Sequence, residues 1–232
     1  MTPAASQTPI RYGPAHLQPV TRRIIGLDLG KAVDFTALTI LDYTWPPALT
    51  PLVSGQPQVA TRPTYHVPAL KRWQLGTSYV DISAWLLKFF MRPDDEPRYG
   101  PPPVLVVDET GVGIAVAEML RQALKGKVPG GMITVTITAG SATSITDEGR
   151  WRVAKKQLAS VLVTLFQSRR LKIAPCPERE VLLKEASEFS VKITAAGNES
   201  FESWRESAHD DLVLSLALAA WAAECVEFPP WP

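Results

Sequence analysis

The chain has 232 residues, of which 46% are hydrophobic and 20% are charged, and its formal net charge is +1. This composition predicts a packed core and excludes an intrinsically disordered chain. Because the total charge is balanced, a surface that binds nucleic acid would require clustered basic residues. The two cysteines, Cys176 and Cys225, form neither a metal-binding pattern nor a disulfide framework, which is typical of a reducing cytoplasm.

The N-terminal segment 1–20 contains four prolines and shows no hydrophobic periodicity. We expect a flexible arm or linker remnant there, followed by one folded domain at residues 21–232. The segment lacks the apolar core of a signal peptide. The apolar run 212–223 is too short to span a bilayer and follows two acids, so it predicts a buried helix and no membrane contact.

Short apolar runs in the first half of the chain predict strands. The stretch "RRIIGLDLG" at 22–30 ends in an acid and a glycine, as a buried central strand would. The β-branched and aromatic segment 34–45 predicts a second strand that pairs back on the first, and 64–70 predicts a third. Helical spacing over 78–91 predicts a helix with one buried face, formed by Val80, Ala84, Leu87 and Met91.

The second half of the chain alternates strands with helices, which predicts an α/β domain with a mixed sheet. The segment 138–156 is expected to be a mobile loop. The 155–170 helix has the clearest amphipathic face, formed by Leu158, Val161, Leu162, Leu165 and Phe166. Strands are predicted at 103–113, 131–140 and 190–195, and the other helices at 114–124, at 179–189 and around 212–223.

Carboxylates end or open several of these apolar elements. Asp28 ends the first predicted strand, Asp108 ends a later one, and Asp210 and Asp211 open the last helix. Because sites in open α/β sheets form at the carboxyl ends of the strands, we expect these acids to meet at one edge. Each acid also has a structural interpretation, as a turn residue, a polar strand end beside Glu109 or a helix cap. Their joint pattern favours a site.

Clustered carboxylates require a compensating positive charge, because like charges raise one another's pKa. Oxygen ligands favour Mg²⁺ or Mn²⁺ over zinc. Two such ions about 3.5–4 Å apart form the two-metal arrangement for in-line displacement at phosphorus. The predicted chemistry is therefore phosphodiester hydrolysis with two divalent ions.

Four stretches in this order resemble the nuclease domain of bacteriophage terminase large subunits: "IIGLDLGKAVDFTAL", "VVDETGVGIAVAEML", "KKQLASVLVTLFQSRRLKI" and "HDDLVLSLALAAW". The resemblance runs from about Arg22 to Ala223, and "D-x-TGVG" and "HDDLV" are its more specific motifs. It implies a ribonuclease H-like fold for residues 21–232, with antiparallel first strands, then parallel strands, flanked by helices. It also implies a metal-dependent endonuclease that cuts double-stranded DNA in viral genome packaging.

The resemblance also assigns roles by position. Asp28 corresponds to the first-strand acid, Asp108 to the second-strand acid, and Asp210 with Asp211 to the last-helix acids. All four are candidate metal ligands, and the family pattern favours Asp211 over Asp210. His209 corresponds to a histidine that supports the site or handles a proton.

Further expectations come with the family. Asp34 lies where an additional acid assists the site. A complete large terminase has a motor ATPase, whereas this chain has no G-x-x-x-x-G-K-[ST] phosphate loop, so it is either an excised nuclease domain or a stand-alone product. The implied partners are double-stranded DNA, a motor ATPase domain, the small terminase subunit and the portal, at the viral procapsid in the cytoplasm of a bacterial host.

Basic residues before and at the start of the 155–170 helix predict the DNA contacts, which would neutralise phosphates without reading sequence. The densest group is Arg150, Arg152, Lys155 and Lys156. Trp151, in the middle of this group, is interpreted either as a DNA contact or as part of its own domain. A second basic group predicts a solvated helix end, formed by Arg169, Arg170 and Lys172.

Three alternative functions stay open. A Holliday-junction resolvase or recombinase nuclease would share the fold and the metal site but cut branched DNA. An actin-like or sugar-kinase ATPase would use "GLDLG" as a phosphate loop, but 232 residues are few for its two subdomains, and it has no role for the last-helix acids. A non-catalytic DNA-binding module would have no reason to keep mutually repelling carboxylates.

Overall fold

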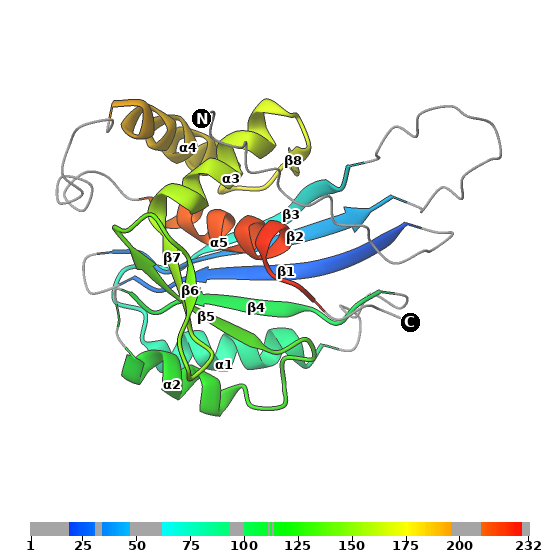
Figure 1. The fold of residues 1–232 in the computed structure, drawn as a ribbon. Helices are drawn as coiled ribbons and strands as arrows, with labels where there is room; N and C mark the ends of the chain where they lie inside the picture. The colour runs from blue at the N-terminus through cyan, green and yellow to red at the C-terminus, as the bar shows by residue number, and fades with distance from the viewer. Residues whose placement is uncertain are drawn as a thin grey trace.

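The computed structural model describes residues 19–30, 34–46, 62–92, 100–110, 112, 114–195 and 210–228, with side chains as far as residue 188 in the long segment. In chain order the elements are β1 (Val20–Asp28), β2 (Ala37–Trp45), β3 (Thr64–Arg72), α1 (Tyr79–Phe90), β4 (Val104–Asp108), α2 (Ile114–Ala123), β5 (Met132–Thr138), β6 (Ser144–Ile145), β7 (Trp151–Ala154), α3 (Lys155–Gln167), β8 (Leu171–Ile173), α4 (Arg179–Ala195) and α5 (Asp211–Cys225). Helices α1 and α2 cover one face of the sheet, and α3, α4 and α5 cover the other (Figure 1).

All the strands form one mixed sheet, in the order β6-β7-β5-β4-β1-β2-β3-β8. β1, β2 and β3 pair antiparallel as successive neighbours, whereas β4, β5 and β7 extend the sheet from β1 in parallel. At the edges, β6 pairs antiparallel with β7, and β8 pairs parallel with β3. The predicted mixed sheet, with antiparallel first strands and then parallel strands, is confirmed.

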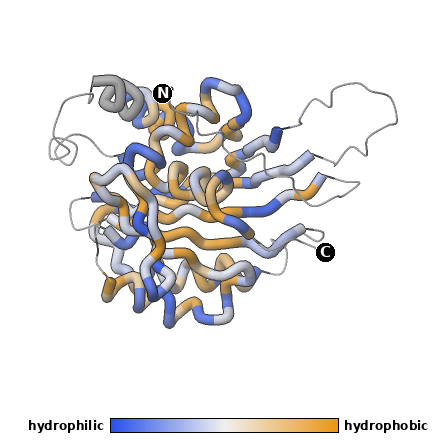
Figure 2. Tube along the Cα trace, in the orientation of Figure 1, coloured by the Kyte–Doolittle hydropathy of each residue, from blue (hydrophilic) through white to orange (hydrophobic). Residues whose placement is uncertain are grey.

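The central strands β1 and β4 are buried on both faces, which explains why their sequences are almost continuously apolar. Ile24 and Val106 face the α3–α5 layer, whereas Ile25 and Leu105 face α1 and α2. Figure 2 shows hydrophobic residues along much of these strands. Asp28 and Asp108, which end these strands, are therefore charged residues at buried positions where packing alone would favour apolar ones.

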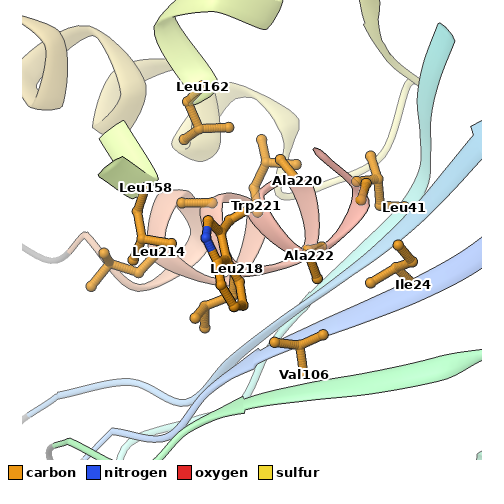
Figure 3. Close-up of a cluster of buried hydrophobic side chains, with 14 of the residues drawn as sticks. Ile24, Leu41, Val106, Leu158, Leu162, Leu214, Leu218, Ala220, Trp221 and Ala222 are labelled. Carbon is orange, nitrogen blue, oxygen red and sulfur yellow. The ribbon is translucent and has the colours of Figure 1, made fainter. Parts of the chain in front are cut away.

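Helix α5 lies between the sheet and the other two helices of its layer, and every residue of Asp211–Ala223 is buried. Trp221 packs among Leu158 and Leu162 of α3 on one side and the strands on the other (Figure 3). Gly26 of β1 permits the close approach, because a β-carbon there would overlap a backbone carbonyl of α5. The predicted buried helix is confirmed, and each buried leucine contributes roughly 1.5–3 kcal/mol.

The predicted buried face of the 78–91 helix is wrong. Val80 and Met91 of that face are 66% and 60% exposed. The buried residues of α1 are instead Ile82, Ser83, Leu86 and Phe89. Two apolar stripes run along this helix. The one that packs on the sheet contains the fully buried Ile82 and Leu86. Beside it, Trp85 stacks on Phe89 at 5.4 Å and meets Trp73 edge-on at 5.3 Å.

Two segments differ from the sequence prediction in their secondary structure. Residues 190–195, predicted as a strand from their β-branched composition, continue helix α4 without interruption. Extending an existing helix fixes one residue per added hydrogen bond, so a weak local strand preference is overridden. The 138–156 segment, predicted as a mobile loop, contains the β6–β7 hairpin and the start of α3.

The structure describes only the last two residues of the predicted 1–20 arm. β1 begins at Val20, and most of the predicted 1–20 arm lies outside the described residues. Among the described helices, none is long and apolar enough to cross a membrane.

Candidate active site

Asp28 and Asp108 end two adjacent parallel strands and are direct partners in the register. Both are buried, with 8% and 7% of their surfaces exposed. The predicted meeting of these two acids at one sheet edge is therefore what the structure shows. Each lies where an apolar strand ends, so the sheet holds the two carboxylates at the same level.

Helix α5 brings the last-helix acids to the same place. Burial raises the pKa of the Asp28 carboxyl well above its usual range. Charges on Asp108, Asp211 and Asp210 raise it further, in decreasing order. These effects require proximity, so the four predicted acids lie near one another, and we refer to them as the acid cluster. Asp211 is buried, whereas Asp210, just before the helix, is partly exposed.

Asp108 is held in place by its own turn. The backbone N–H of Thr110 donates to Asp108 Oδ1 at 2.8 Å, and the Thr110 hydroxyl donates to the same oxygen. The backbone N–H of Ile137 on β5 donates to that hydroxyl at 2.6 Å. Burial raises the pKa of Asp108 to about 6, although the hydrogen bonds from Thr110 act to lower it.

Lys155, the first residue of α3, enters the acid cluster. Its ammonium lies 3.5 Å from Asp210 Oδ2, and its charge lowers the pKa of both Asp28 and Asp108. Burial lowers the pKa of Lys155 itself, and the neighbouring acids oppose that effect. A residue predicted to contact DNA phosphate thus compensates carboxylate charge in this structure.

The other basic residues predicted to contact DNA differ in whether they are paired or exposed. Arg150 Nη1 pairs with Glu109 Oε2 at 2.7 Å, and that carboxylate also accepts from the Thr136 hydroxyl at 2.9 Å. Arg152 and Lys156 are exposed. Arg150 is therefore bound within the domain, whereas the other two face solvent.

Trp151 and Arg170, two other residues that the sequence singled out, both make contacts within the domain. Trp151 packs edge-on against Trp221 at 5.2 Å, so it belongs to its own domain. Asp34 is exposed, and His209 lies outside the described residues. In the second basic group, Arg170 pairs with Glu224 at 3.1 Å, so only part of that group is a solvated helix end.

Sequence reasoning missed Arg72 and Glu185. Arg72 Nη2 lies 2.8 Å from Asp211 Oδ2 and 3.5 Å from Glu185 Oε1. Glu185 Oε2 accepts from the backbone N–H groups of Leu212 and Val213, at 3.0 and 3.1 Å. The sequence places Glu185 three residues after Leu182, at helical spacing, and the structure shows that both are buried on the same side of α4.

Helix capping does not account for the last-helix acids. Asp210 occupies the N-cap position, but its side chain makes no capping hydrogen bond. Glu185 supplies the cap from another helix. The interpretation of Asp210 as the N-cap is correct in position and wrong in chemistry, because its carboxylate is directed toward Lys155.

The donor set has the chemistry of a hard-cation site. Asp28, Asp108, Asp210 and Asp211 offer only oxygen atoms, which Mg²⁺ and Mn²⁺ prefer. Within the described residues, no group of three or more His, Cys, Asp or Glu side chains is already arranged to hold an ion. A bound cation would relieve the repulsion that raises the pKa of Asp28.

No family model matches the sequence, and no curated protein matches it. The nuclease domain of the human cytomegalovirus terminase, Mn soaked, does match in structure: TM-score 0.52 at 11% identity, covering 91% of this chain and 89% of that chain. The same domain matches in a second structure with TM-score 0.49, 12% identity and coverages of 92% and 89%. In a third, Mn soaked and inhibitor bound, these values are 0.47, 11%, 89% and 85%.

At this level of identity, the similarity concerns the fold. The first of these matches covers nearly the whole of both chains, so the similarity extends over most of the domain. The chain has the ribonuclease H-like fold of a terminase nuclease domain, as its sequence motifs predicted.

Proposed function

We propose that this chain, with its terminase-nuclease fold, is a metal-dependent endonuclease that hydrolyses phosphodiester bonds of double-stranded DNA. One observation carries the proposal: Asp28 and Asp108 are buried register partners, and Asp211 lies close enough for its charge to raise the pKa of Asp28. A fold gains nothing in stability from three repelling, buried acids. Their presence together is explained if they bind cations that act on phosphate.

Asp28, Asp108 and Asp211 would hold the divalent ions, Mg²⁺ or Mn²⁺, with Asp210 as a further donor. Two bound ions would supply a Lewis acid for the scissile phosphate and lower the pKa of the attacking water. The protein's own contribution is placement. The sheet sets Asp28 beside Asp108, Thr110 restrains one Asp108 oxygen, and Lys155 offsets part of the negative charge.

The exposed Arg152 and Lys156 are the proposed phosphate contacts, because they lie next to Lys155 in sequence and face solvent. Phosphate contacts of this kind position a duplex without selecting its sequence. Arg150 is left out of this set, since its guanidinium is paired with the buried Glu109.

A role in viral genome packaging is part of the proposal, and the terminase-type fold supports it. The sequence has no phosphate loop of the Walker type, so DNA translocation would require a motor ATPase domain or subunit as partner. A small terminase subunit and a portal are the other proposed partners, at a procapsid in the host cytoplasm.

The proposed activity is tested by incubating supercoiled plasmid with the protein and Mg²⁺ or Mn²⁺. Wild type should nick and linearise the plasmid, and Asp28→Ala, Asp108→Ala and Asp211→Ala should not. DNA binding without any cutting in either metal would indicate a non-catalytic module instead. Faster cutting of a four-way junction than of linear duplex would favour a resolvase.

A further inference from the structure

We propose that Arg72 and Glu185 are positioning residues that place Asp211 in the acid cluster. This inference rests on the proposed nuclease site. Neither residue is a proposed metal ligand. Glu185 fixes the start of helix α5, and Arg72 fixes the carboxylate that the helix presents.

Glu185 replaces a local cap at the N-terminus of α5. The first turn of a helix has backbone N–H groups without intrahelical partners. Glu185 Oε2 accepts from two of them, at Leu212 and Val213, the two residues that follow Asp211. A negative charge at this end also interacts favourably with the helix dipole. The cap comes from α4, so the position of the α5 terminus depends on the packing of a second helix.

Arg72 connects this cap to Asp211. Its Nη2 atom lies 2.8 Å from Asp211 Oδ2 and 3.5 Å from Glu185 Oε1. Its guanidinium carbon lies 4.0 Å from the centroid of the Phe35 ring, which restricts its orientation. Arg72 ends β3, so the contact ties the sheet to both helices. A single guanidinium nitrogen contacts both carboxylates, so the position of the whole planar group, held against the Phe35 ring, sets the position of the Asp211 carboxylate.

The Arg72–Glu185 pair has a purpose beyond stability because of its surroundings. Asp211 is repelled by Asp28, and Glu185 is repelled by Asp211. Arg72 lies between Glu185 and Asp211 and offsets the repulsion between them. By binding one oxygen of Asp211, it fixes the orientation of that carboxylate beside the other acids.

The far end of α5 provides a matched control. There Arg170 Nη1 lies 3.1 Å from Glu224 Oε1, and the Tyr65 hydroxyl donates to the same oxygen. The Arg170 guanidinium also lies over the Tyr65 ring, at 5.4 Å. This pair has the same chemistry, an arginine, a glutamate and an aromatic ring, and it anchors the same helix.

The experiment compares Arg72→Gln and Glu185→Gln with Arg170→Gln and Glu224→Gln. Mn²⁺ affinity is measured by calorimetry, and kcat and KM are measured on a linear duplex, at a temperature well below every melting point. Residues that orient metal ligands typically contribute about 10–100-fold to affinity or activity. We expect losses of that size in Mn²⁺ affinity and kcat for the first pair, with KM for DNA changed less than about threefold, and near-wild-type values for the control pair.

Two further measurements keep the proposal falsifiable where a variant is unstable. Arg72→Lys keeps the positive charge and should recover part of the lost Mn²⁺ affinity. Amide hydrogen exchange at Leu212 and Val213 should accelerate in Glu185→Ala, which removes both acceptor oxygens, and stay unchanged in Glu224→Ala. Equal Mn²⁺ affinity and kcat in the two pairs of variants, or unchanged exchange in Glu185→Ala, would overturn the proposal.

The outcome also separates this inference from the proposed function. If wild type binds Mn²⁺ without cutting DNA, the proposed nuclease activity fails, while the Mn²⁺ affinities of the four variants still decide whether Arg72 and Glu185 position the site. If wild type cuts DNA and the two pairs of variants behave alike, the activity stands and the positioning role fails.

Discussion

The two ends of helix α5 carry similar side chains in different surroundings. Asp211 pairs with Arg72 at the N-terminal end, and Glu224 pairs with Arg170 at the C-terminal end. The Asp211 side chain is 7% exposed and lies among other acids, whereas that of Glu224 is 32% exposed and shares its contacts with Tyr65. The same kind of ion pair therefore lies beside the proposed metal ligands at one end and apart from them at the other.

This difference shows that the role of an acid–arginine pair depends on its burial and on the charges around it. Partly exposed pairs contribute little to stability, because solvent screens them. A buried pair beside further like charges is costly to maintain, and breaking it leaves an uncompensated charge. The N-terminal end of α5 carries that cost, and the proposed chemistry is the reason.

Removal of a central acid gives the largest expected difference between the ends. Asp28→Asn and Asp108→Asn should each lower the Mn²⁺-dependent cleavage rate by more than about 100-fold, beyond the effect of outer residues that only orient ligands. Asp28→Asn should also raise the melting temperature of the metal-free protein, because it removes a buried charge whose pKa is raised by burial and by its acidic neighbours. Plasmid cleavage and thermal unfolding check the two parts. Retained cutting in Asp108→Asn would contradict the assigned site.

A substitution in the middle of α5 should lower the stability of the whole domain without acting specifically on either end of the helix. Leu218 is fully buried, and Leu218→Ala should destabilise the fold by about 2–5 kcal/mol through lost burial and a residual cavity. For a chain of this length that corresponds to roughly 5–15 °C in melting temperature. Thermal unfolding followed by circular dichroism measures it. Below the lower melting point, kcat should stay close to wild type, and a specific loss of kcat would show that helix packing and site placement are coupled.

The pH dependence of stability should distinguish the acidic end. A carboxyl whose pKa folding raises contributes stability that is full below its ordinary pKa and is lost as the pH rises through the folded value. For Asp108 that window runs from the ordinary value of 3.8 to about 6, and the pKa of Asp28 is raised as well. Mn²⁺ binds the ionised form, so it should raise the melting temperature by a few degrees more at about pH 7.5 than at about pH 5.

Scanning fluorimetry with and without Mn²⁺, at the two pH values, measures this effect. Asp108→Asn provides the comparison, because it lacks one of the titrating groups and should show a smaller pH dependence. A melting-temperature increase that is the same at both pH values would argue against metal binding by these carboxyls.

The C-terminal end should respond with a small, purely structural effect. Tyr65→Phe removes the hydroxyl that donates to Glu224 and should destabilise the fold by about 0.5–1.5 kcal/mol. Chemical denaturation measures the loss. Cleavage rates should not change, and a drop in kcat would remove the distinction between the two ends.

The exposed basic residues should give the smallest effect. Arg152→Ala and Lys156→Ala should each weaken binding to duplex DNA uniformly across sequences. Each should also reduce the slope of log K against log salt by about 1. Fluorescence anisotropy at several salt concentrations tests this. Arg150→Ala should leave the slope unchanged, since its charge is already paired with Glu109.

Local sequence patterns were sufficient to predict much of the fold and to identify the acids at the strand ends. Asp28 and Asp108 each end a run of residues that is apolar on both faces of the sheet, so their polarity is visible without any structure. Residues 212–223 have no polar face, which is enough to predict that the helix is buried. Parallel pairing then places strand-end acids at one edge as a matter of geometry.

Predictions failed where two local patterns competed. The 78–91 helix has two apolar stripes, and packing on the sheet buries the one that contains Ile82, Leu86 and Phe89. Residues 190–195 have β-branched side chains typical of strands, yet they follow a helix that has no break to stop it. Neither choice depends on the segment alone.

By itself, the sequence determined which acids could form a site and which helix would carry two of them, because burial and strand ends follow from local patterns of apolar residues. Only the tertiary structure decided how Asp211 is held. Its partner Arg72 is 139 positions away in the chain, and Glu185, which caps the helix, is 27 positions from Leu212. Such contacts are fixed by the packing of β3, α4 and α5 together, and no pattern within a single segment encodes them.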